Sequence, residues 1–321
     1  MRNAADRVDR RSFLQVGASG LGAVTLAAHA PQGPGPPGGS AQVSQRTQFQ
    51  IACMTLPYSQ FPLERALTGI RDAGFHYVAW GTTHRDNGNA LPVLAADAPV
   101  ARARDLATRC RDLGLEPVLM FSGVYPEAPS GLEVLRQRVL QAAAARIPQV
   151  LTFGHTQGGN EQLWLDRFRQ LGPLARDQAV TIVVKQHGGE TGTGAACARI
   201  TRRLGDDGIK VNYDAGNVMD YLQLDPLPDI RACADEVRSF CIKDHRNFPG
   251  PHQDCGPGLG EIDHYRLLWP VAFTGRTMPL CCENLFAPRL PRPTQPQAID
   301  TLAKRAREFL ELVVQGLQAM S

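Results

Sequence analysis

The segment TIVVKQHGG, at residues 181–189, carries the pattern on which the fold prediction rests. It begins with a nearly continuous apolar run and changes to polar residues and glycine from Lys185 onward. Such runs are typical of parallel strands that are buried on both faces of a sheet. The stretch PVLMF, at residues 117–121, has the same character. We therefore predict buried parallel strands at both places, with polar side chains where the first of them ends.

Outward from this segment, a unit of one short strand and one amphipathic helix repeats along the chain from Gln48. The predicted strands are Gln50–Leu56, Tyr77–Gly81, Glu116–Ser122, Val150–His155, Thr181–His187, Lys210–Asn217, Val237–Asp244 and Met278–Asn284. The predicted helices are Pro62–Ala73, Val100–Leu113, Leu132–Arg146, Leu163–Gln178, Ala195–Leu204, Pro228–Val237, Glu261–Phe273 and Gln295–Gln315.

Eight such pairs in roughly 270 residues suit an α/β fold with a single (β/α)8 TIM barrel. A doubly wound open sheet is the alternative. No G-x-G-x-x-G motif follows the first predicted strand, which argues against a dinucleotide-binding fold.

The first 30 residues are predicted to be an export signal. The run DRRSFL, at residues 9–14, contains two adjacent arginines, a weakly apolar stretch follows, and residues 28–30 suit a cleavage site. This layout resembles a twin-arginine signal, with a disordered basic tail as the alternative. Residues 31–48 are rich in proline and glycine and are predicted to be a linker, so the barrel would occupy residues 49–316. The expected location is periplasmic or extracytoplasmic.

The charge of the chain argues against nucleic-acid binding. The 321 residues carry a formal net charge of +3, and the first 30 hold four arginines and two aspartates, which leaves +1 on the mature chain. No apolar run reaches the roughly 18 residues of a membrane span, so no stable membrane association is expected after export. The eight cysteines include no C-x-x-C pair and are predicted to be mostly free thiols.

Two lysines are the first candidates for chemistry. The chain has four lysines among its 34 basic residues, and two of them, Lys185 and Lys243, lie at predicted strand ends. Barrels of this kind hold their active sites at the carboxyl ends of the strands. An ammonium group there can act as an acid or an electrophile, or pair with a carboxylate. We predict catalytic roles for both lysines, and a structural ion pair is the alternative.

Histidine and acidic side chains follow the other predicted strands. His155 and Glu283 are predicted to be catalytic, and Glu283, at the end of an apolar strand, would be costly to bury without a partner. His187 and Asp214 lie in the polar stretches that end the fifth and sixth predicted strands. The alternatives are a buried, hydrogen-bonded His155, a strand cap at His187 and an Asx turn at Asp214.

Four residues are predicted to contact a substrate. Trp80 would suit stacking on a sugar ring, although a role in the core is equally consistent with its position. His245 and His252 lie in a loop rich in proline and glycine, where they either contact the substrate or are simply exposed. Asn217 is a further candidate, with a turn as the alternative.

Five motifs together resemble one known family. They are VKQHGG at 184–189, NYDAGN at 212–217, IKD at 242–244, GLGEID at 258–263 and CEN at 282–284. Their order and spacing resemble the xylose-isomerase-like barrel superfamily, which includes sugar and sugar-phosphate isomerases and epimerases and the family-two AP endonucleases. The resemblance covers residues 48–315.

The resemblance implies a divalent metal at the barrel mouth, held by Glu, Asp, His and Glu. Asp214 and Glu283 match two of these ligands, whereas Lys185 and Cys241 replace the other two. His187 is a further candidate ligand beside Asp214 and Glu283, so Mn²⁺, Mg²⁺ or Zn²⁺ is the expected metal. The ammonium of Lys185 could replace part of the role of the metal.

The function implied is isomerisation or epimerisation of a free or oxidised sugar by metal-assisted proton transfer through an enediolate. A lyase or hydrolase that cleaves keto-glycosides by β-elimination, and a sugar-binding barrel without activity, are the alternatives. The expected partner is a small carbohydrate rather than nucleic acid.

Overall fold

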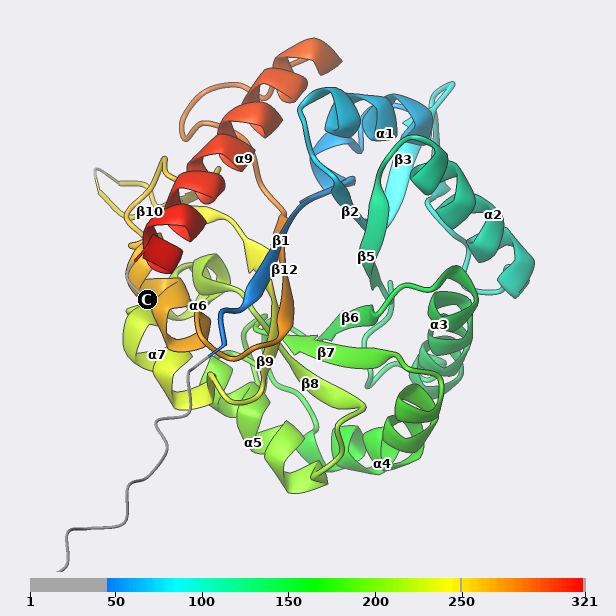
Figure 1. Cartoon of the computed structure of the whole chain (residues 1–321). Coiled ribbons are helices and arrows are strands. Elements are labelled where there is room, and N and C mark those ends of the chain that lie inside the picture. Colours follow the sequence, from blue (N-terminus) through cyan, green and yellow to red (C-terminus); the bar gives the residue numbers. More distant parts are fainter. Residues whose placement is uncertain (1–44, 249, 320–321) are drawn as a thin grey trace, which may run out of the picture. The chain divides into compact units, whose positions relative to one another are not determined.

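Apolar segments in the described residues, 45–248 and 250–319, form eight parallel strands that close into a barrel (Figure 1). In this computed structural model the strands are β1 (Gln48–Met54), β2 (Tyr77–Trp80), β5 (Glu116–Phe121), β6 (Gln149–Phe153), β7 (Thr181–Lys185), β8 (Ile209–Tyr213), β9 (Val237–Ile242) and β12 (Thr277–Cys282). β1 pairs with both β2 and β12, which closes the ring. The predicted single (β/α)8 TIM barrel is confirmed.

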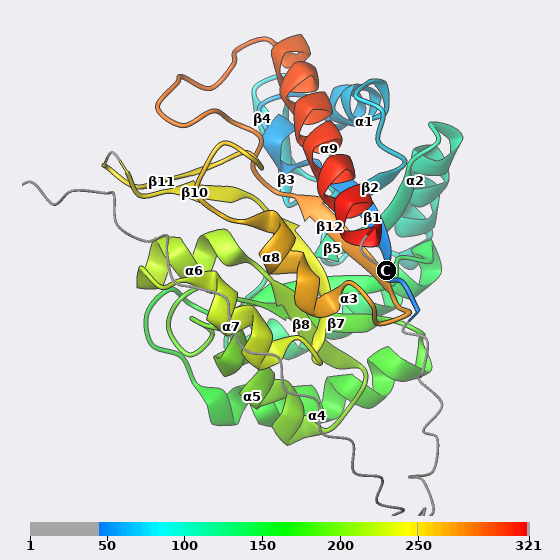
Figure 2. The ribbon, with the colours of Figure 1, turned by 60° about the vertical axis from the view of Figure 1, so that its left-hand side comes forward.

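Helices surround the barrel (Figures 1 and 2). They are α1 (Leu63–Asp72), α2 (Val100–Asp112), α3 (Gly131–Ala145), α4 (Glu161–Asp177), α5 (Gly194–Leu204), α6 (Ala215–Leu222), α7 (Pro226–Cys233), α8 (His264–Leu268) and α9 (Pro296–Ala319). Gly74 and Gly114 follow α1 and α2 with φ angles of 87° and 78°, a conformation that favours glycine after a helix end. Among the helices of the described residues, none is both long enough and apolar enough to cross a membrane.

Local capping shifts several boundaries away from the predicted ones. The sixth strand was expected to reach Asn217, but it ends at Tyr213 because the Asp214 carboxylate accepts a hydrogen bond from the Asn217 N–H and starts α6. The helix expected over residues 228–237 is α7, which begins two residues earlier and ends before β9. The helix expected over residues 261–273 is split into α8 and a short 3-10 turn, Trp269–Val271, which contains a proline.

The segments after β2 and β9 each form a hairpin. The sequence pattern did not predict these two hairpins. β3 (Thr83–Asp86) pairs with β4 (Asn89–Pro92), and β10 (Asp244–Arg246) pairs with β11 (Gln253–Cys255), both antiparallel. Figure 2 shows the second hairpin projecting beyond the barrel strands, above α6. These strands of three or four residues are too short to show a clear alternation of apolar and polar positions.

Side-chain alternation divides the core into two layers. One apolar cluster fills the inside of the barrel and includes Val183, Cys241 and Cys281. The larger cluster lies between the barrel and the helices and includes Trp80 and Trp164. Because successive side chains of a strand point to opposite faces, the inward positions continue toward the mouth of the barrel at every second residue.

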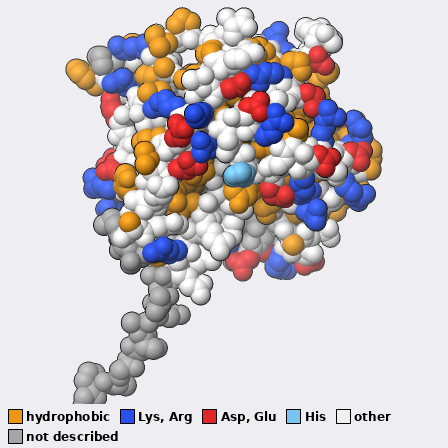
Figure 3. All heavy atoms as spheres, turned by 45° about the horizontal axis from the view of Figure 1, so that its top comes forward, with side chains coloured by type: hydrophobic (Ala, Val, Ile, Leu, Met, Phe, Trp, Pro, Cys, Tyr) orange, Lys and Arg blue, Asp and Glu red, His pale blue; other side chains and the backbone are white. Residues whose placement is uncertain are grey.

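The start of the described chain shows where the barrel begins relative to the predicted linker. β1 starts at Gln48, and the buried Thr47 hydroxyl donates a hydrogen bond to the carbonyl of Val271, so the barrel includes the last residues of the segment predicted as a linker. The predicted export signal and the rest of that segment lie outside the described residues. On the face drawn in Figure 3, basic and acidic side chains lie among one another. All eight cysteines lie in the described part of the chain, where they are buried and form no disulfide.

Candidate active site

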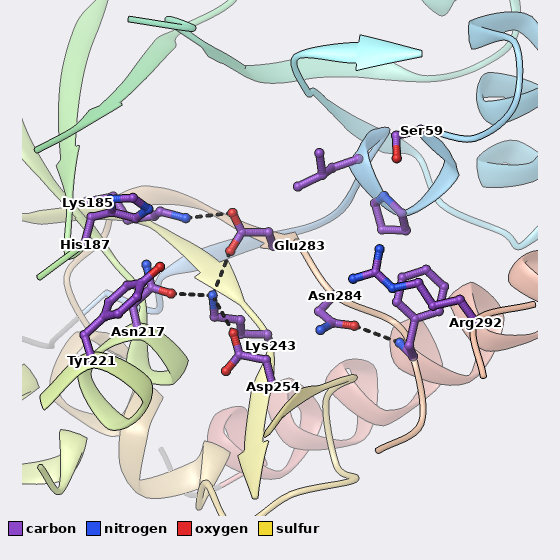
Figure 4. Close-up of a pocket in the computed structure, with 13 residues that line it drawn as sticks. Ser59, Lys185, His187, Asn217, Tyr221, Lys243, Asp254, Glu283, Asn284 and Arg292 are labelled. Carbon is purple, nitrogen blue, oxygen red and sulfur yellow. Dashed lines mark hydrogen bonds and ion pairs between the residues drawn. The ribbon is translucent and has the colours of Figure 1, made fainter. Parts of the chain in front are cut away.

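A cavity of about 300 Å³ opens at the carboxyl ends of the barrel strands (Figure 4). Five residues that the sequence singled out line it, namely Lys185, His187, Asn217, Lys243 and Glu283. Lys185, Lys243 and Glu283 each lie two positions after a residue of the apolar cluster inside the barrel. The alternation of the strands therefore turns all three inward, just where the packed interior gives way to the open mouth.

Two lysines and two carboxylates form one continuous ion-pair network. The Nζ atom of Lys185 lies 2.6 Å from Oε1 of Glu283 and 3.2 Å from Oδ2 of Asp214. The Nζ atom of Lys243 lies 3.2 Å from Oε2 of Glu283 and 3.3 Å from the same Oδ2 of Asp214. All four side chains are almost fully buried, so each charge depends on the others for compensation.

Lys243 reaches this position because its neighbours leave room for it. A side chain at Gly216, in the first turn of α6, would come within 2.6 Å of the Lys243 methylene chain. The ammonium also donates a hydrogen bond of 2.5 Å to Oδ1 of Asn217 and lies 3.1 Å from Oδ2 of Asp254 (Figure 4). Lys243 therefore contacts three carboxylates and one amide, which fix its position.

The network determines the protonation of its members. Burial opposes the charge of both lysines, but the neighbouring carboxylates outweigh it and raise the pKa of Lys185 and that of Lys243. Burial likewise opposes the charge of Glu283, yet the two ammonium groups hold its pKa well below the usual range. Burial raises the pKa of Asp214 to about 6, with help from the charges of Glu283 and Asp254. Near neutral pH the pocket therefore holds two ammonium ions.

His187 faces the same pocket as a neutral imidazole. Its Nδ1 lies 2.9 Å from the carbonyl oxygen of Gly154 and donates to it, which leaves the lone pair on Nε2. Its ring contacts those of Phe153 and Tyr221, at centroid distances of 4.4 and 5.3 Å. Burial lowers the pKa of His187, and the charge of Lys185 adds to this effect. The side chain can therefore accept a proton at neutral pH.

The start of α6 is fixed by hydrogen bonds to the preceding strand end. The backbone N–H of Asp214 donates to Oε1 of Gln186, and the Asn217 amide donates to the Gln186 carbonyl. Oδ1 of Asp214 caps the helix, which directs Oδ2 at the two lysines. The Asx turn that was considered for Asp214 and its place in the ion-pair network are thus compatible.

The motif GLGEID has a structural role next to the pocket. The buried Asp244 carboxylate accepts hydrogen bonds from the backbone N–H groups of His245, Gly258 and Ile262. A side chain at Gly260 would come within 2.3 Å of Oδ1 of Asp244. Asp244 therefore holds the loop after β11 against the start of β10, which sets the position of the hairpin that carries Asp254.

The residues present do not fit a divalent metal between Asp214 and Glu283. Both ammonium groups already contact both carboxylates, and two lysines balance the charges that would otherwise hold the ion. Cys241 lies close enough to both to complete a group of three ligands. Burial, however, raises the pKa of its thiol, whereas a metal ligand must be a thiolate.

His155 and Trp80 are among the predicted site residues that do not line this cavity. His155 follows β6, is exposed, and packs on Tyr125 with ring centroids 4.0 Å apart. Trp80 belongs to the outer apolar layer because it stands one position out of phase with the inward residue Ala79. Neither placement supports the predicted roles, which were catalysis for His155 and substrate binding for Trp80, in the central cavity.

The two loop histidines lie together beside the cavity rather than in its lining. His245 is fully buried, and its Nδ1 lies 2.8 Å from Oδ1 of Asp254. His252 is half exposed, and its Nδ1 lies 3.3 Å from Oδ1 of Asp220. The two imidazole centroids are 5.6 Å apart.

Asp254, Tyr221 and Arg292 line the cavity but were not singled out in the sequence. Asp254 lies in the loop of His252 and was overlooked because the short β11 gives no periodic signal. Tyr221 belongs to α6, the helix that was not predicted. Arg292 comes from the loop after β12 and is one of many arginines, so no sequence signal distinguishes it.

The comparison with family models identifies the class of the protein. Residues 43–311 match the model described as a xylose isomerase-like TIM barrel, so the chain belongs to this family. A comparison of the sequence with curated proteins gives no match.

Solved structures of low sequence identity share the fold. A Mycobacterium smegmatis xylose isomerase-like TIM barrel protein in complex with magnesium has 15% identity and a TM-score of 0.63, over 85% of this chain and 98% of that one. A D-psicose 3-epimerase in the presence of D-fructose has 11% identity and a TM-score of 0.61, over 83% and 99%. A xylose isomerase-like TIM barrel/4-hydroxyphenylpyruvate dioxygenase fusion protein has 20% identity and a TM-score of 0.63, over 83% of this chain and 43% of its own length.

Proposed function

We propose that this protein is an enzyme that isomerises or epimerises a sugar derivative by moving a proton from the carbon next to a carbonyl group. The observation that carries the proposal is the pair of buried ammonium groups between Asp214 and Glu283, in a pocket that also contains a neutral His187. Enolisation needs a base for the carbon-bound proton and positive charge for the oxygen. These side chains supply both.

In the first step, Nε2 of His187 accepts the proton, and the electron pair of the C–H bond moves to the carbonyl oxygen. Lys185 and Lys243 donate hydrogen bonds to the resulting enolate oxygen. His187 then returns the proton, either to the same carbon after the planar enolate has turned its other face toward the imidazole, or to the neighbouring carbon. In the second case Lys185 delivers a proton to the former carbonyl oxygen. It then accepts the proton of the neighbouring hydroxyl group, which becomes the new carbonyl.

The same enolate would lead to elimination if the next carbon carried a glycosidic oxygen. The C–O bond would then break, and the departing oxygen would take a proton from a neighbouring ammonium. The first step and its residues are unchanged, so the product decides between isomerisation and β-elimination.

Arg292 favours a sugar acid as the substrate. A sugar acid is an oxidised sugar that carries a carboxylate. Its guanidinium lines the cavity and lies 4.7 Å above the Phe286 ring. Within the described residues it forms no ion pair with a carboxylate, unlike Lys185 and Lys243. A guanidinium group binds a carboxylate through two parallel hydrogen bonds, so Arg292 would orient a sugar acid at the mouth of the pocket.

Deuterium exchange from solvent tests the proposed function. Neutral sugars and sugar acids are incubated with the protein in D2O, and NMR follows the carbon next to the carbonyl. We expect deuterium there, and we expect exchange to survive treatment with a chelator because the lysines supply the charge. An unsaturated product would identify β-elimination.

Two histidine variants test whether His187 in particular is the base. His187→Gln should abolish exchange, whereas His76→Ala, at an exposed position before β2, should leave it unchanged. The proposal would be contradicted by full exchange in His187→Gln, or by loss of exchange with the chelator and recovery with Mn²⁺ or Mg²⁺.

The proposed location is extracytoplasmic, by way of the twin-arginine pathway. The support is the arginine pair at residues 10 and 11 and the small residues at 28–30. Replacement of both arginines by lysine should retain a folded protein in the cytoplasm, as measured by cell fractionation. Normal export of that variant would refute this part of the proposal.

A further inference from the structure

We propose that Asp220, His245 and His252 form a binding site for a divalent metal of the Zn²⁺ type, separate from the ion-pair network at the centre of the barrel. The three residues come from α6, from β10 and from the position just before β11. This site does not depend on the proposed catalytic function.

The first observation is the geometry of the three side chains. One ligand atom of each, a carboxylate oxygen and two ring nitrogens, lies within 4.8 Å of the others. A tetrahedral ion with bonds of about 2.0–2.1 Å needs ligand atoms roughly 3.3 Å apart. Asp220 Oδ1 and His252 Nδ1 are already separated by 3.3 Å. A small adjustment of the side chains would bring the set around one ion.

The second observation concerns His245, which is fully buried. Its Nδ1 is engaged by Asp254, whereas its Nε2 is buried and has no hydrogen-bond partner among the described residues. A buried polar atom without a partner is costly, and a metal ion would satisfy it. Histidine ligands of metals usually donate their other N–H to a carboxylate, which fixes the tautomer, and Asp254 is placed to accept it.

The ligand types indicate the class of metal. Two imidazoles and one carboxylate suit Zn²⁺ and related transition ions better than Mg²⁺ or Ca²⁺, which prefer oxygen ligands. Three protein ligands leave a fourth position of a tetrahedral ion open. His252 and Asp220 are partly exposed, with 49% and 31% of their side chains accessible, so a small molecule can approach that position.

Asp254 connects this site to the central pocket. Its Oδ1 contacts His245, and its Oδ2 lies 3.1 Å from Nζ of Lys243. A metal on His245 would therefore fix the carboxylate that also holds Lys243.

Metal titration of the full chain tests this proposal. After dialysis against a chelator, the protein is titrated with ZnCl2 by calorimetry and with CoCl2 by visible absorption. We expect one ion per chain, with Co²⁺ bands typical of four- or five-coordination. His252→Ala should weaken Zn²⁺ binding by at least about 100-fold. Asp254→Asn, which replaces the outer partner of His245 and one of the carboxylates that contact Lys243, should weaken it by about 10- to 100-fold.

Two controls locate the ion. His76→Ala removes an exposed histidine that is distant in sequence from the three proposed ligands, and it should leave Zn²⁺ affinity unchanged. Asp214→Asn should also leave it unchanged, because Asp214 belongs to the central network. Unaltered affinity in His252→Ala would overturn the proposal, and so would loss of binding in Asp214→Asn, which would place the metal between the central carboxylates.

Discussion

The Nζ atom of Lys185 lies 2.6 Å from Oε1 of Glu283, although 98 positions separate the two residues in the chain. The other oxygen of the same carboxylate lies 3.2 Å from Nζ of Lys243. One side chain from the last barrel strand thus joins two ammonium groups at the ends of β7 and β9. The positive charge at the mouth of this barrel is therefore supplied by covalently attached groups, whose position follows from the strands that carry them.

Removal of one of these ammonium groups should impair catalysis more than folding. Lys185→Met keeps most of the unbranched apolar part of the side chain and leaves Glu283 paired with Lys243. If Lys185 stabilises an enolate oxygen, kcat should fall by about 10²-fold or more, as for the loss of one preorganised donor. Steady-state kinetics on the substrate found by deuterium exchange measures this effect, with thermal unfolding as the check on folding.

The matched control for this substitution is Lys304→Met. Lys304 lies on α9 and is mostly exposed, with only a surface pair to Glu308. Its replacement should change neither kcat nor the unfolding temperature appreciably. Full activity of Lys185→Met would mean that this lysine only balances charge, and the chemistry would then depend on His187, Asp214 and Glu283.

Restoring the ligands that the family motif contains should create metal dependence at the centre of the barrel. In Lys185→Glu/Cys241→His, two substitutions convert the site to Glu, Asp, His and Glu. Three buried carboxylates would repel one another without a cation, so we expect an unfolding temperature that rises strongly with added Mn²⁺. Both proteins carry His252→Ala to remove the proposed Zn²⁺ site, and the one in which Lys185 and Cys241 are intact should show no such rise. An equal response of both proteins to Mn²⁺ would contradict the exclusion of metal by lysine.

The pH dependence of kcat/KM should report the proposed base. Burial lowers the pKa of His187, so its neutral form is present above a midpoint that lies below 6.5, the ordinary value. The rate should therefore rise as pH increases through that midpoint and remain high at pH 7. An NMR titration of the His187 ring gives the midpoint directly. A value above 6.5 would leave much of the imidazole protonated near neutrality and would argue against its role as the base.

Arg292 should affect substrate binding rather than the chemical step. If its guanidinium holds a substrate carboxylate, Arg292→Gln should raise KM for sugar acids about 10-fold or more, consistent with loss of a charge-assisted hydrogen bond worth roughly 1.5–3 kcal/mol. KM for neutral sugars should stay the same. Equal changes for both classes would show that Arg292 acts through Phe286 packing and not through a carboxylate.

The sequence predicted the barrel well because the strands have strong local patterns. The inward positions of β7, β9 and β12 carry apolar residues up to the mouth, and the next inward position is Lys185, Lys243 or Glu283. The order of the strands along the chain then brings these residues together. The same alternation explains the placement of Trp80, because the inward neighbour Ala79 leaves the tryptophan facing the helices.

The remaining features depend on contacts that no local pattern reveals. Asp214 was expected within a strand, yet its hydrogen bond to the Asn217 N–H starts α6 and adds Tyr221 to the pocket. Asp254 becomes a partner of Lys243 only because the β10–β11 hairpin folds back over the strand ends. Arg292 reaches the cavity from an irregular loop after β12.

The two central carboxylates should contribute unequally to stability, although they share the same lysines. Glu283 has a strongly lowered pKa, and Glu283→Gln would remove the carboxylate that joins the two buried lysines, so we expect a loss of about 3–5 kcal/mol in the free energy of unfolding. The pKa of Asp214 is raised to about 6, which shows that the fold disfavours its charge. Asp214→Asn should therefore cost less than half as much, since asparagine can still cap α6.

The pH dependence of this second variant gives the sharper test. A group whose pKa is higher in the folded than in the unfolded state, about 6 against about 3.9 for Asp214, adds stability that is full below the lower value and is lost as pH rises through the higher one. Asp214→Asn lacks this contribution, so its deficit against wild type should be larger at pH 4.5 than at pH 7.5. Urea unfolding at both pH values measures it, with Asp166→Asn on the exposed face of α4 as the control. A deficit that grows toward pH 7.5, or one that exceeds that of Glu283→Gln, would mean that Asp214 is held as a stable carboxylate and that both lysines depend on it as much as on Glu283.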